Sequence, residues 1–223
     1  MKCVITTTGS GGHLFPAICV AEELRKKSHE VLFIGALQAA TEHLKRRRFS
    51  YRHIESSGLR KNPVSALRSL FQYFIGMFSA KFILRVFKAN VVISFGGFGS
   101  VSAVWAAAAL KIPVLIHEQN VVPGKANRFL ARYARRIAIS FSESEKYFPG
   151  KDVSVSGYPC LLEKSSYERK ALLLKYGLQD NKKTILVFGG SQGSQHINQA
   201  FAESIAAVSE KISFQFIHIC GQT

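Results

Sequence analysis

The stretch CVITTTGSGGH, residues 3–13, decides the fold of this chain, because a run of β-forming residues breaks there into a cluster of glycines. The same pattern returns in VVISFGGFGS at 91–100 and in TILVFGGSQGS at 184–194, and each cluster leads into a predicted helix. Backbone N–H groups at the start of a helix have no partner inside it and readily bind anions. The three glycine turns therefore predict a ligand that carries phosphate groups.

Strands and helices alternate along the whole chain. Predicted strands lie at 2–7, 30–34, 51–54, 91–95, 114–118, 136–140, 153–156, 184–188 and 214–219, and helices fill most of the gaps. Strands such as VVISF and VLIHE are apolar on both faces, which is typical of a parallel sheet covered by helices. We therefore predict an α/β fold with a doubly wound sheet. Ligands of such folds lie at the carboxyl ends of the strands, where all three glycine turns fall.

A domain boundary is predicted where GYPCLLEKSS, residues 157–166, interrupts this alternation. We expect a complete Rossmann-like domain at 1–158 and the beginning of a second one at 159–223. The second piece holds about one βαβ unit, so it can bury little apolar surface by itself.

Composition limits the class of protein and its partners. The 223 residues are 47% hydrophobic and 20% charged, which is typical of a folded chain. Lys and Arg number 30 against 14 Asp and Glu, and the net charge of +16 favours phosphates, nucleic acid or an anionic membrane as partners. Four cysteines without metal-type spacing, and an N-terminus without signal-peptide features, indicate a protein of the reducing cytoplasm.

The first glycine turn matches neither common nucleotide motif. Gly9-Ser10-Gly11 begins like a dinucleotide fingerprint, but Leu14 stands at the place of its third glycine, and no glycine is followed by the Lys-Ser or Lys-Thr of a P-loop. The turn ends instead in His13, at the start of a helix whose dipole disfavours a charged imidazole. His13 is therefore either a base for a substrate hydroxyl or a residue that orders the turn.

A second polar cluster, HEQN at residues 117–120, stands at the carboxyl end of an apolar strand. Four polar side chains at such a position indicate a ligand site. The alternative is a hydrogen-bonded turn that holds the loop after it.

Together, His13 followed by Phe15-Pro16, GGFGS at 96–100, HEQN and GGSQGS at 189–194 resemble the MurG family, in order from about residue 3 to residue 199. Enzymes of this bacterial family add N-acetylglucosamine to the lipid-linked muramoyl-pentapeptide precursor of peptidoglycan. The resemblance implies a GT-B fold, with the active site between two Rossmann-like domains. It also implies an inverting transfer from UDP-N-acetylglucosamine that uses no metal or other cofactor.

The resemblance further implies roles for individual residues. His13 becomes the candidate base for the acceptor hydroxyl. Four residues of the first domain are expected to reach the donor: Ser10, Gly11, Gly12 and Asn120. Three residues of the third turn are expected at the donor diphosphate: Gly190, Ser191 and Gln192. Gly97 in the middle turn is expected near the diphosphate of the acceptor, and the alternative is a tightly packed turn between strand and helix.

The segment from 59 to 88 bears on membrane binding. Large apolar residues recur there at three- and four-residue steps: Leu67, Leu70, Phe71, Phe74, Ile75, Phe78 and Phe82. Basic residues flank them: Lys61, Arg68, Lys81, Arg85 and Lys88. The uncharged run at 69–80 is shorter than the about 20 residues that span a bilayer, but an amphipathic helix suits an anionic membrane surface. The alternative is an internal helix with a solvated basic edge.

The expected partners follow from these observations and from the resemblance. They are UDP-N-acetylglucosamine, the undecaprenyl-linked muramoyl-pentapeptide and an anionic membrane surface, with no nucleic acid. The expected location is the cytoplasmic face of the bacterial inner membrane, where the protein binds peripherally.

Two departures from the family pattern bear on activity. Tyr158 and Leu161 stand where the family has Asn and a donor-binding Arg. The family's donor domain also continues well past the residue that matches Thr223. Two further hypotheses therefore stay open: a truncated, catalytically impaired relative that only binds the membrane or the lipid-linked acceptor, and a nucleotide-sugar epimerase of similar fold. The basic aromatic segment disfavours the epimerase.

Overall fold

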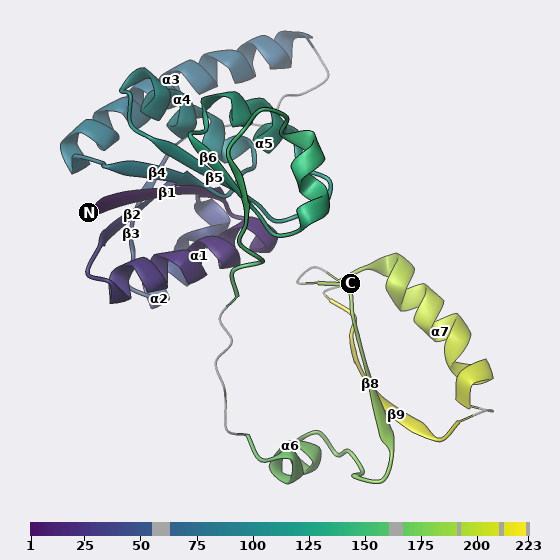
Figure 1. Ribbon diagram of the computed structural model, residues 1–223. Coiled ribbons are helices and arrows are strands. Elements are labelled where there is room, and N and C mark those ends of the chain that lie inside the picture. The colour runs from purple at the N-terminus through teal and green to yellow at the C-terminus, as the bar shows by residue number, and fades with distance from the viewer. Residues whose placement is uncertain (55–62, 161–166, 191–192, 210–211, 222–223) are drawn as a thin grey trace. The chain divides into compact units, whose positions relative to one another are not determined.

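The computed structural model describes residues 1–54, 63–160, 167–190, 193–209 and 212–221 (Figure 1). Contacts within the chain divide it into two compact units, residues 1–161 (unit 1) and residues 162–223 (unit 2). The boundary expected after Tyr158 lies close to this division.

Unit 1 is built on one parallel sheet of seven strands in the order β3-β2-β1-β4-β5-β6-β7. The strands are β1 (Lys2–Thr8), β2 (Glu30–Ala36), β3 (Ser50–His53), β4 (Val91–Ser94), β5 (Val114–Glu118), β6 (Arg136–Ile139) and β7 (Val153–Val155). The chain winds outward from β1 to β3, returns to place β4 beside β1, and then winds the other way. The predicted doubly wound sheet is confirmed, and its switch point lies between β1 and β4.

Helices cover both faces of this sheet (Figure 1). One face carries α1 (Gly11–Lys26) and α2 (Thr41–Arg46); the other carries α3 (Pro63–Phe87), α4 (Val101–Ala109) and α5 (Lys125–Leu130). Neighbouring residues of a strand point to opposite faces. Ile5 of β1 accordingly belongs to the core cluster that includes Ile18 of α1, while Val4 belongs to the cluster that includes Leu84 of α3 and Val104 of α4. Both cores hold the ends of β1 and β4 in place.

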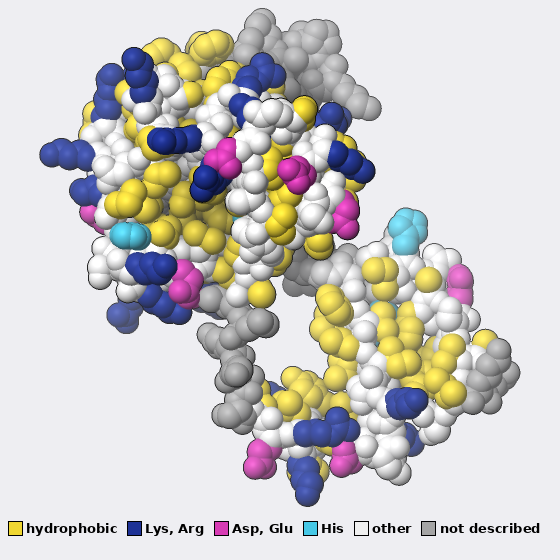
Figure 2. Space-filling model, in the orientation of Figure 1, with side chains coloured by type: hydrophobic (Ala, Val, Ile, Leu, Met, Phe, Trp, Pro, Cys, Tyr) yellow, Lys and Arg dark blue, Asp and Glu magenta, His cyan; other side chains and the backbone are white. Residues whose placement is uncertain are grey.

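Unit 2 contains α6 (Arg169–Lys175), β8 (Lys183–Phe188), α7 (Gln195–Ser209) and β9 (Phe214–Ile219). Strands β8 and β9 pair in parallel, as the crossover helix α7 between them requires. No residue of α7 is buried, and large apolar side chains such as Leu186, Phe188 and Ile219 are exposed. Hydrophobic side chains cover much of the face of unit 2 that Figure 2 shows. The unit buries as little apolar surface as its size predicts.

Candidate functional site

Two of the three glycine turns lie side by side at the switch point of unit 1. Strands β1 and β4 are parallel neighbours, with Thr6 paired to Ser94, so the turns after them meet at the carboxyl edge of the sheet. Gly97 has a φ of +78°, and a Cβ added to it would stand 2.3 Å from Cγ2 of Thr8. Packing of the two turns therefore requires glycine at this position. A contact between Gly97 and the acceptor stays a prediction.

Helix α1 begins directly after the first turn. Its N-cap residue Ser10 makes no side-chain capping bond, and the hydroxyl of Ser10 lies 3.1 Å from that of Thr8 instead. The N–H of His13 donates to the Ser10 carbonyl at 3.1 Å. The N–H groups of Gly11 and Gly12 precede this bond, and helix geometry offers them no carbonyl within α1. Two amides and two hydroxyls thus gather where the helix dipole favours an anion.

Glu118, in the HEQN cluster, is a buried carboxylate with 1% of its surface exposed. Its Oε1 accepts bonds from the backbone N–H (2.9 Å) and from Nδ2 (3.1 Å) of Asn120. Its Oε2 accepts bonds from the Gly124 N–H (3.2 Å) and from Nδ2 of Asn127 (2.9 Å). Four donors offset the cost of burying the charge. For Glu118 the hydrogen-bonded-turn interpretation is confirmed, because this residue holds the loop after β5.

Asn120 is exposed and is held in place through Glu118. Its backbone N–H and its side-chain amide both point back to that carboxylate. The contact with the donor stays a prediction.

Gln119, from the same cluster, reaches the first glycine turn. Its Oε1 lies 3.0 Å from Nδ1 of His13. Its Nε2 donates to the carbonyls of Phe95 (3.2 Å) and His117 (3.1 Å). Gln119 is 5% exposed, and His13 is half-buried. A residue that follows β5 therefore holds a histidine in the first turn of α1, which follows β1, across the intervening strand β4.

His117 extends this hydrogen-bonded chain into the core. Its Nδ1 lies 3.2 Å from Nε2 of Gln119, its Nε2 lies 3.2 Å from the Gly157 carbonyl, and its ring centroid is 5.4 Å from that of Phe95. Burial lowers the pKa of His117 below the usual 6.5, against the smaller opposing effects of the Gly157 carbonyl and the Glu118 charge. At pH 7 the ring is neutral, with one N–H and one lone pair.

Gln119 has no role in the sequence-based assignment, although it stands inside the cluster that was singled out. The signal for a site was the run of four polar residues after an apolar strand. The sequence gave no sign that Gln119 contacts His13, because the two residues are 106 positions apart in the chain.

The third glycine turn belongs to unit 2. Gly190 is exposed with a φ of +85°, and its carbonyl accepts a bond from the Gly193 N–H at 3.1 Å. Ser191 and Gln192, the other residues expected at the donor diphosphate, lie outside the described residues, as does Leu161. Their roles stay predictions.

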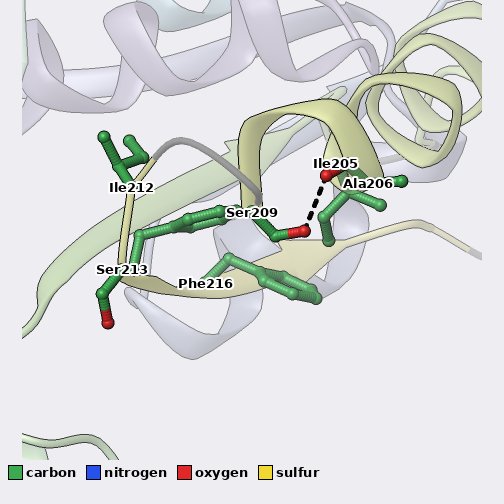
Figure 3. Close-up of a pocket in the computed structure, with 7 residues that line it drawn as sticks. Ile205, Ala206, Ser209, Ile212, Ser213 and Phe216 are labelled. Atoms are coloured by element: carbon green, nitrogen blue, oxygen red, sulfur yellow. Dashed lines mark hydrogen bonds between the residues drawn. The ribbon is translucent and has the colours of Figure 1, made fainter.

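Unit 2 also has a hollow of about 400 Å³ between the end of α7 and the start of β9 (Figure 3). Its lining is Ile205, Ala206, Ser209, Ile212, Ser213, Phe214 and Phe216, and the Ser209 hydroxyl donates to the Ala206 carbonyl at 2.7 Å. Parallel sheets bind ligands at the other end of their strands. Since none of the described residues that line it carries a charge, the hollow offers a diphosphate no cationic partner among them.

Helix α3 carries a row of exposed apolar side chains, which we call the α3 stripe. Its members recur at three- and four-residue steps and are between 46% and 69% exposed: Phe71, Phe74, Ile75, Phe78, Phe82 and Val86. The other side of α3 packs into the core through Tyr73, Ala80 and Leu84. Over the described residues, the structure has no helix with the length and apolar character needed to cross a membrane.

The fold and site together define the class of protein. A doubly wound unit with glycine turns at its switch point, followed by a βαβ unit with a further glycine turn, is the architecture of the GT-B class. The chain belongs to glycosyltransferase family 28: the pattern of the family's N-terminal domain matches residues 3–139, and that of its C-terminal domain matches residues 184–223.

Curated relatives agree with this assignment. Proteins from Halalkalibacterium halodurans and Halothermothrix orenii are 39% and 40% identical to the chain over 99% of its length. Both are named UDP-N-acetylglucosamine–N-acetylmuramyl-(pentapeptide) pyrophosphoryl-undecaprenol N-acetylglucosamine transferase. The chain spans 62% and 61% of their respective lengths.

Solved structures show the same fold. Acinetobacter baumannii MurG is 28% identical with a TM-score of 0.76, and the match covers 100% of this chain and 61% of MurG. The UDP-GlcNAc 2-epimerase of Neisseria meningitidis matches with a TM-score of 0.71 over 100% of this chain and 66% of the epimerase. Its identity of 19% shows a shared fold alone.

Proposed function

We propose that this protein transfers N-acetylglucosamine from UDP-N-acetylglucosamine to the muramoyl 4-hydroxyl of undecaprenyl-pyrophosphoryl-MurNAc-pentapeptide. The observation that carries the proposal is the placement of His13. It stands at the N-terminus of α1, beside the N–H groups of Gly11 and Gly12, which have no carbonyl partner within the helix, and its Nδ1 is held by Gln119. The names of the relatives supply the identity of the donor and the acceptor.

In the proposed reaction the 4-hydroxyl oxygen attacks the anomeric carbon of the donor sugar. The bond from that carbon to the β-phosphate oxygen breaks, and its electron pair leaves with UDP. The hydroxyl proton passes to Nε2 of His13, and attack opposite the leaving group inverts the anomeric centre. Preorganised amides favour the negative charge that develops on UDP, so the proposal assigns no metal to this step.

The remaining assignments of the proposal follow the family resemblance. Ser10, Gly11, Gly12 and Asn120 contact the donor from unit 1, and Gly190, Ser191 and Gln192 hold its diphosphate from unit 2. Gly97 lies toward the acceptor diphosphate.

The test of this function is turnover of radiolabelled UDP-N-acetylglucosamine with the lipid-linked acceptor. His13→Ala is expected to lower kcat by about 100-fold or more, since general bases contribute that much, and to leave donor affinity within about twofold. His29→Ala is the matched control, because His29 precedes β2 at the opposite edge of the sheet. Normal turnover of the His13 variant would remove this residue from the mechanism. A wild-type protein that binds the acceptor without transferring sugar would favour the impaired relative.

We also propose that the α3 stripe rests on the anionic cytoplasmic face of the bacterial inner membrane. Six exposed apolar side chains form the stripe. Lys81 and Arg85 belong to the same helix, and Lys88 follows its last residue. Figure 2 shows further Lys and Arg side chains spread over unit 1. Apolar insertion combined with basic charge is how peripheral helices bind such surfaces.

Sedimentation with vesicles that contain phosphatidylglycerol tests this binding. Changing Lys81, Arg85 and Lys88 to Glu is expected to weaken it by roughly 100-fold or more, at about 1 kcal/mol for each basic residue. The control changes Lys45, Arg46 and Arg48 to Glu, which alters the net charge equally at the other side of unit 1. Equal loss in both variants would mean that only net charge matters, and unchanged binding in the first would refute the proposal.

A further inference from the structure

The hydrogen bonds around Gln119 determine which way its amide points. The carbonyls of Phe95 and His117 can only accept hydrogen bonds, and both lie within 3.2 Å of one end of this amide. That end must therefore be the NH2 group. Rotating the amide by half a turn would place its oxygen against two carbonyl oxygens, so the oxygen faces His13.

This orientation reaches the ring of His13. Oε1 of Gln119 can only accept, and it lies 3.0 Å from Nδ1 of His13. Nδ1 must then carry the ring proton, which leaves the lone pair of the neutral imidazole on Nε2.

We propose that Gln119 is a positioning residue that holds His13 in the Nδ1–H tautomer and thereby makes Nε2 the atom that accepts the substrate proton. The effect on catalysis rests on the proposed function. The tautomer of His13 does not, because it depends only on the hydrogen bonds of the folded protein. Without the bond to Gln119, an imidazole is free to place its proton on Nε2, and that form cannot accept the hydroxyl proton there.

His117 supports the orientation of Gln119 from the opposite side. Its Nε2 lies 3.2 Å from the Gly157 carbonyl, which requires the ring proton on Nε2. Its Nδ1 therefore carries a lone pair and faces the NH2 group of Gln119 at 3.2 Å. The whole chain, from the Gly157 carbonyl through His117 and Gln119 to His13, has one consistent assignment of donors and acceptors.

The test reads the tautomer directly. Histidine labelled with ¹⁵N gives well-separated signals for protonated and unprotonated ring nitrogens, and two-bond ¹H–¹⁵N correlations assign them to Nδ1 and Nε2. The spectrum of His13→Ala identifies the His13 signals among those of the seven histidines. In the wild type, His13 is expected to be protonated at Nδ1 and unprotonated at Nε2.

Two substitutions separate the hydrogen bond from simple packing. Gln119→Met keeps the length of the side chain and removes the acceptor, so His13 is expected to shift toward the Nε2–H form. Gln119→Glu, as the neutral acid, keeps a carbonyl oxygen facing Nδ1 and an O–H facing the carbonyls of Phe95 and His117, and it is expected to retain the Nδ1–H form. A role in packing alone predicts the reverse order of damage, because the apolar side chain suits a buried site better than the acid does.

Kinetics connect the tautomer to turnover. Gln119→Met is expected to lower kcat by roughly five- to tenfold, the bias that one neutral hydrogen bond supplies, with the KM for the donor unchanged. In the His13→Ala background the same substitution should have no further effect on kcat.

The outcomes distinguish this inference from the proposed function. Protonation at Nε2 in the wild type, or an unchanged Nδ1–H form in Gln119→Met, overturns the inference, and the wild-type spectrum decides alone where that variant does not fold. An Nδ1–H spectrum in a protein without transferase activity refutes the proposed function and leaves the inference about the tautomer standing.

Discussion

Glu118→Gln replaces one carboxylate oxygen of a fully hydrogen-bonded, buried group with an NH2 group. The carboxylate accepts two bonds on each oxygen, from Asn120 on one and from Gly124 and Asn127 on the other. Whichever way the new amide turns, its NH2 group replaces an oxygen that accepted two N–H groups, and both of those N–H groups lose their acceptor. The change in size is negligible, so any loss of stability reports on these bonds.

The expected loss follows from the bonds that are removed. A hydrogen bond to a charged group contributes about 1.5–3 kcal/mol, and removing two of them at the lower value costs about 3 kcal/mol. Relief from burying a charge keeps the loss near that lower value. Because domains of this size are stable by about 5–15 kcal/mol, the effect is large enough to measure.

Urea unfolding followed by tryptophan fluorescence measures this loss in unit 1 alone. Trp105 is the single tryptophan of the chain and packs against the core that α3 and α4 form with the sheet. The control is Glu42→Gln, the same chemical change at an exposed residue whose ion pair with Arg46 contributes at most about 1 kcal/mol. A loss in Glu118→Gln no larger than that of the control would refute the role of Glu118 in holding the loop.

Two further predictions concern the stability of unit 1. Gly97→Ala is expected to destabilise it by about 2 kcal/mol or more in the same assay, because the position combines a positive φ with a close approach to Thr8. Gly124→Ala, with no atom within 4 Å of the added Cβ, is expected to change stability by less than about 1 kcal/mol, and equal losses would contradict the argument. His117 binds a proton more weakly when folded than when unfolded, so its contribution to stability is complete above pH 6.5 and falls as the pH drops below that value. The slope from this one proton is at most about 1.4 kcal/mol per pH unit, and His117→Gln should flatten the stability–pH curve, whereas a curve of unchanged shape would contradict the prediction.

The architecture could be predicted from the sequence because its signals are local. All nine predicted strands form. Short runs of β-forming apolar residues bounded by glycine or polar turns are the typical sequence pattern of a strand. The doubly wound class follows because these strands are apolar on both faces and alternate with helices. The order of the strands, with the switch point between β1 and β4, has no comparable signal in the sequence and is seen only in the structure. The family resemblance rests on the same segments.

The contacts within the site could not be predicted, because they join residues from different strands. The sequence left His13 open between a base and an ordering residue, and nothing local links it to Gln119. Gly97 was likewise open between ligand contact and tight packing, and only its distance to Thr8 shows that packing requires the glycine. Glu118 stood in a candidate ligand cluster, yet its partners Gly124 and Asn127 show that it holds a loop.

These contacts form only because β1, β4 and β5 are neighbours in the sheet. Gln119 follows β5, and its amide bridges two neighbours. Its NH2 group donates to the carbonyl of Phe95, which follows β4, and its oxygen faces His13, which comes after β1. The first turn is held from β4 as well, through the approach of Gly97 to Thr8. His13, in the first turn of the helix that follows β1, is therefore positioned by residues that follow β4 and β5, the two strands across the switch point from β1. Since every group in this arrangement lies in unit 1, a change at the end of β4 is expected to disturb His13, although β4 supplies no residue to the proposed reaction.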